Sequence, residues 1–416
     1  MADRGDLRRH LRLVRSSPPR DLVATARIDL WLLVTPTLVL TLFGLVMVLS
    51  AGSVSAAQGY DGNSFWYFQR QVLYAGVGLG GMLLAWRLPY RTWSVFAVPL
   101  LLVTAALMVV AIAHPSRTCL YGACRWIDLG PITLQPSEFA KLGSVAFTAA
   151  VLSRKWRHLH DPMHLAIPLA PVVGLIAVLV LMQQDLGTTV IICGSVFLLL
   201  FVAGVRMRHL ALTSLAGLLV GGVMIFSEPY RRTRLFESWL NPESDPLKSG
   251  LQLIQSLVAL GSGGFTGVGL GGSRAKWDFL PNAHSDFIFA VIGEELGMVG
   301  ATAVLVAFGV LLYAGVRIAI HAPDTFGRLL AAGVVAWIGL QIIVNLGAVT
   351  GVLPITGVPL PLLSFGGTAL VVTLLGVGVL ASVAQARARP SMASRPRSSA
   401  VDRAPQVAAG LAGARR

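Results

Sequence analysis

A carboxylate at the mouth of an apolar stretch is the residue of this chain best placed to do chemistry. The segment 280–287 reads Leu-Pro-Asn-Ala-His-Ser-Asp-Phe and runs directly into an apolar stretch. Charge at the edge of a membrane helix is costly and is usually kept for function. Asp286 could accept a proton in a reaction, or it could cap the helix that follows. The local pattern alone favours the cap.

Two deeper acids, Glu294 and Glu295, cannot be close partners of Asp286. If a helix begins at Asp286, Glu294 lies about 80° around the axis and Glu295 about opposite, both roughly 12 Å deeper. We therefore predict that both are structural and that one pairs with a neighbouring helix. His284 either orients Asp286 or caps the start of the helix.

A second polar cluster surrounds residues 122–141. Pro136 suits the first turn of a helix, and Glu138 and Lys141, three residues apart, share one face of it. Their ion pair either locks two helices together, or Lys141 lines a cavity and meets an anionic substrate group. Farther on, Asp185 is expected to cap the next helix.

The glycine-rich segment 261–276 ends in Arg274 and Lys276. Its glycines allow the backbone to approach a large ligand or to pack closely, and the two cations could meet phosphate oxygens. The match to G-x-G-x-x-G at 267–272 lacks the strand-turn-helix context of a dinucleotide site, so we interpret it as accidental. No Walker A sequence is present, and ATP binding is not indicated.

The composition shows what must position these residues. Of 416 residues, 55% are apolar and 12% charged, with a mean hydropathy of +0.72, which excludes a soluble domain. We predict an all-α, polytopic membrane protein of about ten transmembrane helices, because each of its apolar runs can cross a hydrocarbon core of about 30 Å. The runs are 30–51, 71–86, 94–113, 136–153, 164–182, 186–205, 210–227, 286–316, 328–349 and 366–386.

The distribution of Lys and Arg predicts the orientation. With both termini cytoplasmic, the inner segments hold 23 of the 33 basic residues and the outer ones 9, with Lys141 inside a helix. The net charge of +14 is then a signal for orientation and anionic membrane lipids, and no nucleic-acid partner is needed. We expect disordered basic tails at 1–28 and 387–416 and a large extracytoplasmic loop at 228–285, between helices 7 and 8.

The cysteines add a smaller prediction. Cys119 and Cys124 share an outer segment, where a disulfide is possible, although the sequence leaves the bridge open. Cys193 lies in an apolar run, and we expect it to be a buried small apolar residue.

Taken together in this order, the motifs resemble the SEDS family, the FtsW and RodA group, over roughly residues 30–386. The motifs that carry the resemblance are Arg125-Trp126-Ile127, Gln135-Pro136-Ser137-Glu138 with Lys141, Asp185-Leu186-Gly187-Thr188, Gln255-Ser256 before the glycines, Leu280-Pro281 with His284 and Asp286-Phe287, Glu294-Glu295-Leu296-Gly297, and Leu353-Pro354 to Gly357 with Leu360-Pro361, Ser364 and Gly366-Gly367.

The resemblance implies a peptidoglycan glycosyltransferase that polymerises lipid II at the outer face of the bacterial cytoplasmic membrane. It also implies a class B penicillin-binding transpeptidase and other divisome proteins as partners. The family's catalytic aspartate falls on Asp286, which the resemblance favours as general base over a cap. The division-type FtsW role, at the septum, is favoured over RodA-type elongation.

The chemistry that this activity requires assigns roles to the candidate residues. A sugar hydroxyl attacks an anomeric carbon, Asp286 takes its proton, and cations stabilise the leaving pyrophosphate. The substrate-binding candidates are Arg125, Glu138, Lys141, Lys276, His284 and Ser364.

Several positions depart from the family pattern, and one bears on metal binding. Asn282 stands for a usual glutamate, which weakens a metal site made with a second carboxylate beside Asp286. Other departures are Cys124, Gln184, Leu251 and Phe365. No metal ligand is assigned, although a divalent cation, Mg²⁺ or Mn²⁺, on the pyrophosphate stays open.

Two rival functions are a lipid II flippase and a non-catalytic scaffold. The first needs polar groups through the whole membrane depth, whereas here they concentrate in the outer half, with Gln341 and Asn345 as the deeper exceptions. The second does not need such a cluster.

Overall fold

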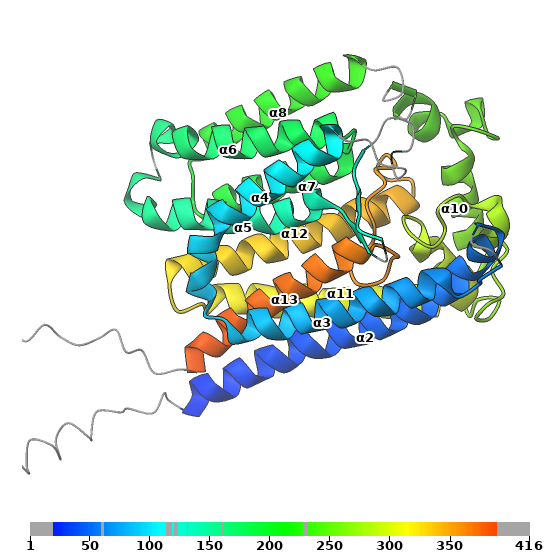
Figure 1. Ribbon diagram of the computed structural model, residues 1–416, viewed down its shortest axis with the longest axis horizontal. Helices are drawn as coiled ribbons and strands as arrows, with labels where there is room; N and C mark the ends of the chain where they lie inside the picture. The colour runs from blue at the N-terminus through cyan, green and yellow to red at the C-terminus, as the bar shows by residue number, and fades with distance from the viewer. Residues whose placement is uncertain are drawn as a thin grey trace, which may run out of the picture.

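The computed structural model describes residues 20–59, 62–113, 119, 124–130, 132–159, 161–227, 232–233 and 235–388, and its long helices run side by side (Figure 1). Each predicted apolar run overlaps one long helix. These helices are α2 (Arg20–Gly59), α3 (Trp66–Arg87), α4 (Trp93–Ala113), α5 (Pro136–Arg154), α6 (Pro162–Met182), α7 (Leu186–Val202), α8 (Met207–Ser227), α11 (Ile288–Ile320), α12 (Thr325–Val349) and α13 (Gly367–Ala388).

The connections hold shorter elements. Strands β1 (Ile127–Asp128) and β2 (Thr133–Leu134) pair antiparallel before α5. The segment between α8 and α11 folds into α10 (Leu251–Ser262) and the short helical turns η3 (Phe236–Leu240), η4 (Pro242–Ser244) and η5 (Ala275–Phe279). The predicted long loop therefore has structure of its own. Among the described residues the all-α class holds apart from one ribbon of two strands, each two residues long.

The long helices are apolar enough for a membrane. Among the described residues, six helical stretches satisfy both length and hydropathy for a span: 23–59, 90–113, 163–182, 288–320, 325–349 and 367–387. The helices α7, α8 and α10 are apolar but contribute shorter stretches. The chain is a multi-pass membrane protein.

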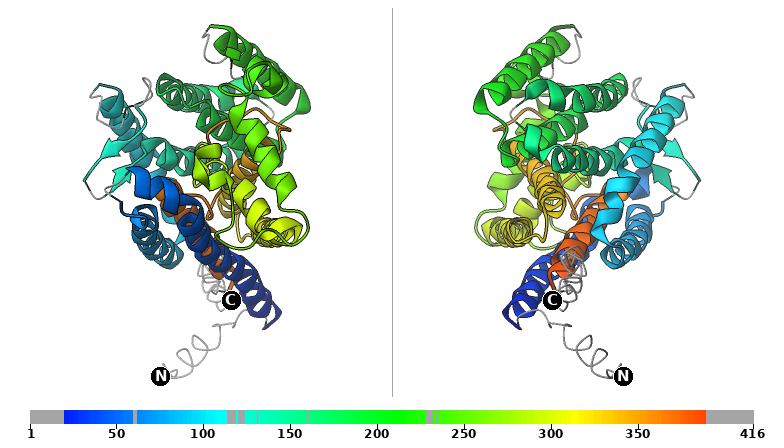
Figure 2. Two further views of the ribbon diagram at one scale, coloured as in Figure 1. Left: turned by 90° about the vertical axis from the view of Figure 1, so that its right-hand side faces the viewer. Right: turned by 90° about the vertical axis from the view of Figure 1, so that its left-hand side faces the viewer.

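Helix α13 lies at the centre of the bundle. It packs along α3, while α11 packs along α2 and α12 packs against α5 and α7. In the apolar windows of α13 and α12, 83% and 61% of the residues are buried. Two views show α8 at the edge, next to α7 and α6 (Figures 1 and 2). The buried helices α5, α12 and α13 therefore hold in place the residues at their ends.

The described start of α2 and end of α13 lie at the same end of the bundle (Figure 1). There the buried Asp29 carboxylate accepts from Arg387 at 2.7 Å and forms an ion pair with Arg317 at 2.9 Å. Arg387 also donates to the carbonyls of Arg317 and Ile318. This cluster joins α2, α11 and α13.

Some sequence predictions are corrected or fall outside the described residues. Helix α2 begins at Arg20, so residues 20–28 extend the first helix instead of belonging to a disordered tail. Residues 1–19 and 389–416 lie outside the described residues. Cys193 is exposed on α7, not buried, because its face of the helix turns away from the bundle. Cys119 and Cys124 are joined in a disulfide.

Candidate active site

The predicted polar residues meet at one end of the bundle, which we call the loop end. It is the end at which α5, α7, α11 and α13 begin and α12 ends, on the right in Figure 1. Because the first turns of several helices converge here, short connections between them can hold side chains from distant parts of the sequence.

Asp286 lies two residues before the start of α11 and is half-buried. The N-cap position of α11 is occupied by Phe287, which has no capping side chain. Neither Asp286 nor His284 therefore occupies the N-cap position itself, since they lie one and three residues before it. The main-chain carbonyl of Asp286 accepts a hydrogen bond of 2.8 Å from Asn345 Nδ2 on α12.

His284 belongs to an aromatic cluster beside Asp286. Its ring centroid lies 4.1 Å from that of Tyr67 and 5.8 Å from that of Phe365. The main chains are also joined, because Phe365 N donates to His284 O at 3.0 Å. Burial lowers the pKa of His284 to about 4, so its imidazole is neutral at neutral pH. The buried Nδ1 has no hydrogen-bond partner.

Helix α11 is broken at Gly297, where φ is 64° and ψ is −160°. The glycine-rich segment inserts into the break and replaces the missing helical hydrogen bonds. Val268 N and Gly269 N donate to the carbonyls of Glu294 and Glu295, while Met298 N and Val299 N donate to the carbonyls of Gly264 and Phe265. The backbone groups that lose their helical partners at the break thus gain partners in the glycine-rich segment, as a membrane environment requires.

The side chains of Glu294 and Glu295 hold the same segment. Glu294 accepts from Arg274 N at 2.9 Å, from Ala275 N at 3.2 Å and from Ser273 Oγ. Glu295 accepts from Ser50 Oγ of α2 at 2.7 Å and lies 3.7 Å from Lys276 Nζ. Both acids have the structural role that the sequence predicted, including the bond to a neighbouring helix.

The two cations of the glycine-rich segment differ in access. Lys276 is buried, and its Nζ also donates to the carbonyl of Gly271. Arg274 is exposed. The charge of Lys276 is therefore engaged within the loop. Of the two cations, Arg274 is the one that a ligand can reach.

The ion pair of Glu138 and Lys141 is enclosed by protein. The two side chains are 2.7 Å apart and essentially unexposed. Lys141 Nζ also donates to Gln341 Oε1 at 2.8 Å and lies 5.6 Å from the ring centroid of Trp337. Of the two interpretations, this geometry favours the structural pair, here joining α5 to α12.

Arg125 and Asp185 fix the turn between α6 and α7. Arg125 donates to the main-chain carbonyls of Gln183 and Gln184 and stays half-buried. Asp185 is the predicted N-cap of α7: its Oδ1 accepts from Thr188 N at 3.0 Å. Its other oxygen accepts from Thr188 Oγ1 at 2.9 Å. Part of the guanidinium remains accessible beside a turn that it holds in place.

Ser364 is a buried turn residue. Its Oγ accepts from Leu360 N at 2.8 Å, and its carbonyl accepts from Gln71 Nε2 of α3 at 3.0 Å. The side chain thus organises the connection between α12 and α13 and does not point to an open site.

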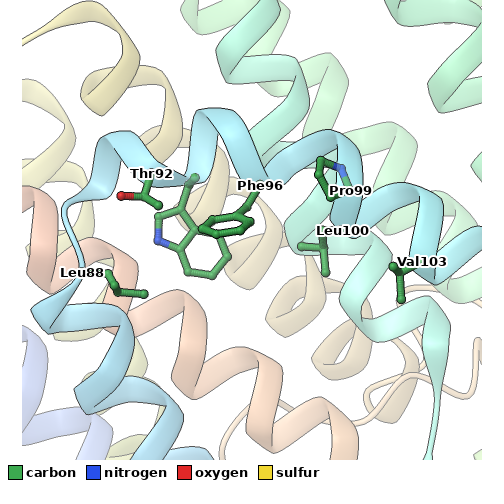
Figure 3. A pocket seen from close by; sticks show the side chains of 7 residues that line it. Leu88, Thr92, Phe96, Pro99, Leu100 and Val103 are labelled. Carbon is green, nitrogen blue, oxygen red and sulfur yellow. The ribbon is translucent and has the colours of Figure 1, made fainter.

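An apolar groove of about 310 Å³ lies along α4 (Figure 3) and is lined by none of these residues. It lies beyond the far end of α3, a helix about 33 Å long that begins at the loop end. The groove has no charged side chain, so it can neither accept a proton nor stabilise a leaving anion. Its lining residues are Leu88, Thr92, Trp93, Phe96, Pro99, Leu100 and Val103.

Comparisons with known proteins support one family. A family model described as a cell cycle protein, for the group FtsW/RodA/SpoVE, matches residues 30–389. The chain is 41% identical over 354 residues to the stage V sporulation protein E of Bacillus subtilis, covering 85% of this chain and 96% of that protein. The chain belongs to the FtsW/RodA/SpoVE family.

Other relatives of this family carry an activity in their names or a solved structure. A probable peptidoglycan glycosyltransferase FtsW of Geobacter metallireducens is 41% identical over 347 residues, covering 83% of this chain and 91% of that protein. RodA of Thermus thermophilus matches with a TM-score of 0.63 and 29% identity over 86% of this chain and 97% of its own. A chain of a peptidoglycan synthase complex matches with a TM-score of 0.70 and 32% identity, over 86% and 98%.

The FtsW/RodA/SpoVE match spans all the candidate residues, yet motif reasoning missed several groups that shape the site. Ser50, Tyr67 and Gln71 were not singled out, and Asn345 and Gln341 were noted only as deep polar exceptions. A signal did exist for Gln341 and Asn345, because they are polar residues four apart in the apolar run 328–349. That spacing places them on one helix face.

Proposed function

We propose that this chain polymerises lipid II as a peptidoglycan glycosyltransferase, with Asp286 as general base. The observation that supports the chemistry is the half-buried carboxylate of Asp286, two residues before α11, with its main-chain carbonyl bonded to Asn345. The name of the Geobacter relative supports the class of reaction.

In the proposed reaction a sugar hydroxyl attacks the anomeric carbon of a lipid-linked sugar. The new carbon–oxygen bond forms as the bond to the pyrophosphate breaks, and the hydroxyl proton passes to the carboxylate of Asp286. Arg125 and Arg274 are accessible and are suited to stabilise the charge on the pyrophosphate. Lys141 and Lys276 are paired inside the protein, with Glu138 and Glu295, so they would act on the structure of the site instead of contacting the pyrophosphate.

His284 has a different role in this proposal from a charged substrate ligand. Its burial and low pKa keep it neutral, so it can accept or donate one hydrogen bond without adding charge beside Asp286. We assign it the orientation of Asp286 or of the attacking hydroxyl.

A divalent cation would have to be held chiefly by the substrate. Within the part of the chain that the structure describes, no group of three or more His, Cys, Asp and Glu residues could hold a metal ion. Mg²⁺ commonly binds through one or two carboxylates plus substrate phosphates, so Asp286 and the pyrophosphate would be the ligands of a transient ion.

We further propose ten membrane spans with both termini cytoplasmic and the loop end outside, in a transmembrane domain of residues 29–386. Supporting this, the described start of α2 and end of α13 lie together. The basic tails would meet anionic lipids. By analogy with the solved synthase complex, the partner is a class B penicillin-binding transpeptidase, and the family relatives named FtsW favour a role in division, at the septum, over elongation.

The test is reconstitution of the purified protein, with and without its transpeptidase, in vesicles containing labelled lipid II. We expect Asp286→Asn to reduce polymer formation by about 10²–10⁴-fold, with Glu243→Gln, at an exposed acid of the segment between α8 and α11, as the matched control that keeps activity. Full activity of Asp286→Asn would falsify the general-base assignment. Transbilayer movement of lipid II without polymer would favour the flippase instead.

A further inference from the structure

We propose that Asn345, supported by Gln341 one turn earlier on α12, is a positioning residue of the reaction, which fixes the main chain at Asp286 and links it to the buried ion pair of α5. The inference rests on the proposed function, since it takes Asp286 as the proton acceptor.

The geometry of Asn345 is specific to an amide. The side chain is 2% exposed, and its Nδ2 donates to two main-chain carbonyls, those of Asp286 and Val358, both at 2.8 Å. A primary amide supplies two neutral N–H donors from one atom. The reversed amide would place its oxygen against both carbonyls, so the orientation is fixed by the two acceptors.

The bond to Asp286 matters because little regular structure holds that residue. It lies in a turn that begins at Asn282, where φ is 58°, and the helix that follows is interrupted at Gly297. Asn345 connects this short half-helix to α12, one of the most buried helices of the bundle. It therefore determines how far the Asp286 main chain stands from the rest of the site.

Gln341 continues the connection to α5. Its Nε2 donates to Pro359 O at 3.0 Å, and its Oε1 accepts from Lys141 Nζ at 2.8 Å and from Trp337 Nε1 at 3.1 Å. The successive carbonyls of Val358 and Pro359 are thus held by two amides on the same face of α12. The polar contacts from Glu138 through Lys141 to Gln341 are thus joined, through the main chain of Val358 and Pro359, to Asn345 and the main-chain carbonyl of Asp286.

This arrangement predicts a loss of rate without a loss of substrate binding. Both N–H groups of Asn345 Nδ2 are engaged by main-chain carbonyls. The side chain is buried, and its Oδ1 accepts no hydrogen bond within the protein, so Nδ2 has no donor to offer a substrate. A displacement of about 1 Å at a reacting group can cost on the order of 100-fold in rate. The effect should appear in kcat and leave KM nearly constant.

The experiment measures kcat and KM for lipid II polymerisation by the full chain with its transpeptidase in vesicles, together with thermal unfolding. We expect Asn345→Asp, which keeps the shape but replaces the N–H donors by a carboxyl group that can donate at most one hydrogen bond, to lower kcat by roughly 10–100-fold with KM within about threefold. Asn345→Ser, which keeps one donor, is expected to lose less and provides a second variant if Asn345→Asp does not fold. The matched control is Ile342→Ala, a buried position of the same helix, which should lose stability and keep kcat.

Two results overturn the inference. The first is that Asn345→Asp and Asn345→Ser both keep a kcat within twofold of the wild type. The second is that, at equal loss of stability, these variants lose no more kcat than Ile342→Ala does. Asp286→Asn in the same assay separates this failure from that of the proposed function. If Asp286→Asn is inactive and Asn345→Asp is fully active, only the positioning role fails. If Asp286→Asn is fully active, the proposed function fails first.

The contribution of Gln341 is tested by combination. Gln341→Met should also lower kcat, and its combination with Asn345→Asp should lose less than the product of the two single effects, because both amides hold the same short segment. A double variant whose loss equals that product would contradict the link through Gln341.

Discussion

At the scale of single residues, the buried charges of this protein are held by other protein groups. Lys141 and Glu138 are both enclosed and 2.7 Å apart. A buried ion pair is weak support for stability as such, but removing one partner leaves an uncompensated charge and costs about 3–5 kcal/mol, whereas replacing both with apolar groups is often neutral. The two interpretations of this pair, structural or substrate-binding, can be separated on that basis.

We expect Lys141→Met to lower the thermal unfolding midpoint strongly and the double variant Lys141→Met with Glu138→Leu to regain most of the loss. The measurement is thermal unfolding of both variants in the same detergent. A double variant no more stable than the single one would show that the pair is not the source of the destabilisation. A stable double variant that forms no polymer would point to a role of Lys141 in the reaction, by a substrate contact or through its hydrogen bond to Gln341.

His284 gives a pH dependence of stability with a definite sign. Its pKa in the folded protein is about 4, lowered by burial from an ordinary value near 6.5. The unfolded chain therefore binds the proton more tightly, so the free energy of unfolding falls as the pH drops from about 6.5 toward 4 and is unaffected above that window. His284→Gln should remove roughly 1–3 kcal/mol of this acid sensitivity.

The measurement is the unfolding midpoint at about pH 7.5, 6 and 5, values that bracket the ordinary histidine pKa. The exposed His321, at the opposite end of α11, provides the control variant His321→Gln, which should keep the wild-type pH dependence. An acid sensitivity that is the same in His284→Gln and the wild type would contradict the assignment.

At the scale of elements, the interrupted helix α11 explains the glycines better than any ligand motif does. A Cβ at Gly297 would lie 2.5 Å from Gly267 N and from Phe265 O, and its backbone conformation is one that only glycine adopts readily. Gly267, with a φ of 80°, would bring a Cβ to 2.2 Å from Glu295 O. These two glycines permit the close approach by which the loop replaces the missing helical bonds.

Gly297→Ala is therefore expected to destabilise the protein by about 2 kcal/mol or more through backbone strain and the clash. It should also abolish polymerisation, because the first part of α11, before Gly297, follows directly on the turn that holds Asp286. Gly309→Ala is the matched control: Gly309 lies on the same helix with no atom within 4 Å of its Cβ position. It should be neutral or stabilise by up to about 1 kcal/mol. Equal stability of the two variants, by thermal unfolding, would contradict this explanation of the glycines.

The sequence predicted where the long helices lie, but it did not predict how the segments between and within them are joined by hydrogen bonds. Apolar runs predicted every long helix, and Pro136 and Asp185 correctly predicted two helix starts. The break at Gly297 was missed, because hydrophobicity continues through it and the compensating donors come from a segment about thirty residues earlier. For the same reason the structural role expected for Glu294 and Glu295 was right, while their partners Ser273 and Ser50 could not be named.

At the scale of the whole molecule, the two ends of the bundle are built differently. The loop end holds Asp286, the half-buried Arg125 and the exposed Arg274. The opposite end is tied by Asp29 with Arg317 and Arg387, and its exposed basic residues make it suited to an anionic lipid surface. A protein with such unlike ends has one favoured orientation in a membrane, which can be measured.

The proposed orientation predicts opposite accessibility at the two ends of α5. Cys124 precedes this helix at the loop end and Arg157 follows it, so the two sites are separated by a helix about 28 Å long. In a background with Cys119→Ser and Cys193→Ser, we expect Cys124 to react with a membrane-impermeant maleimide in intact bacteria. With Cys124→Ser added, Arg157→Cys should react only after the cells are permeabilised. The reverse pattern would place the loop end in the cytoplasm, where lipid-linked sugars on the outer leaflet could not reach Asp286. That result would contradict both the proposed orientation and the proposed reaction at the outer face.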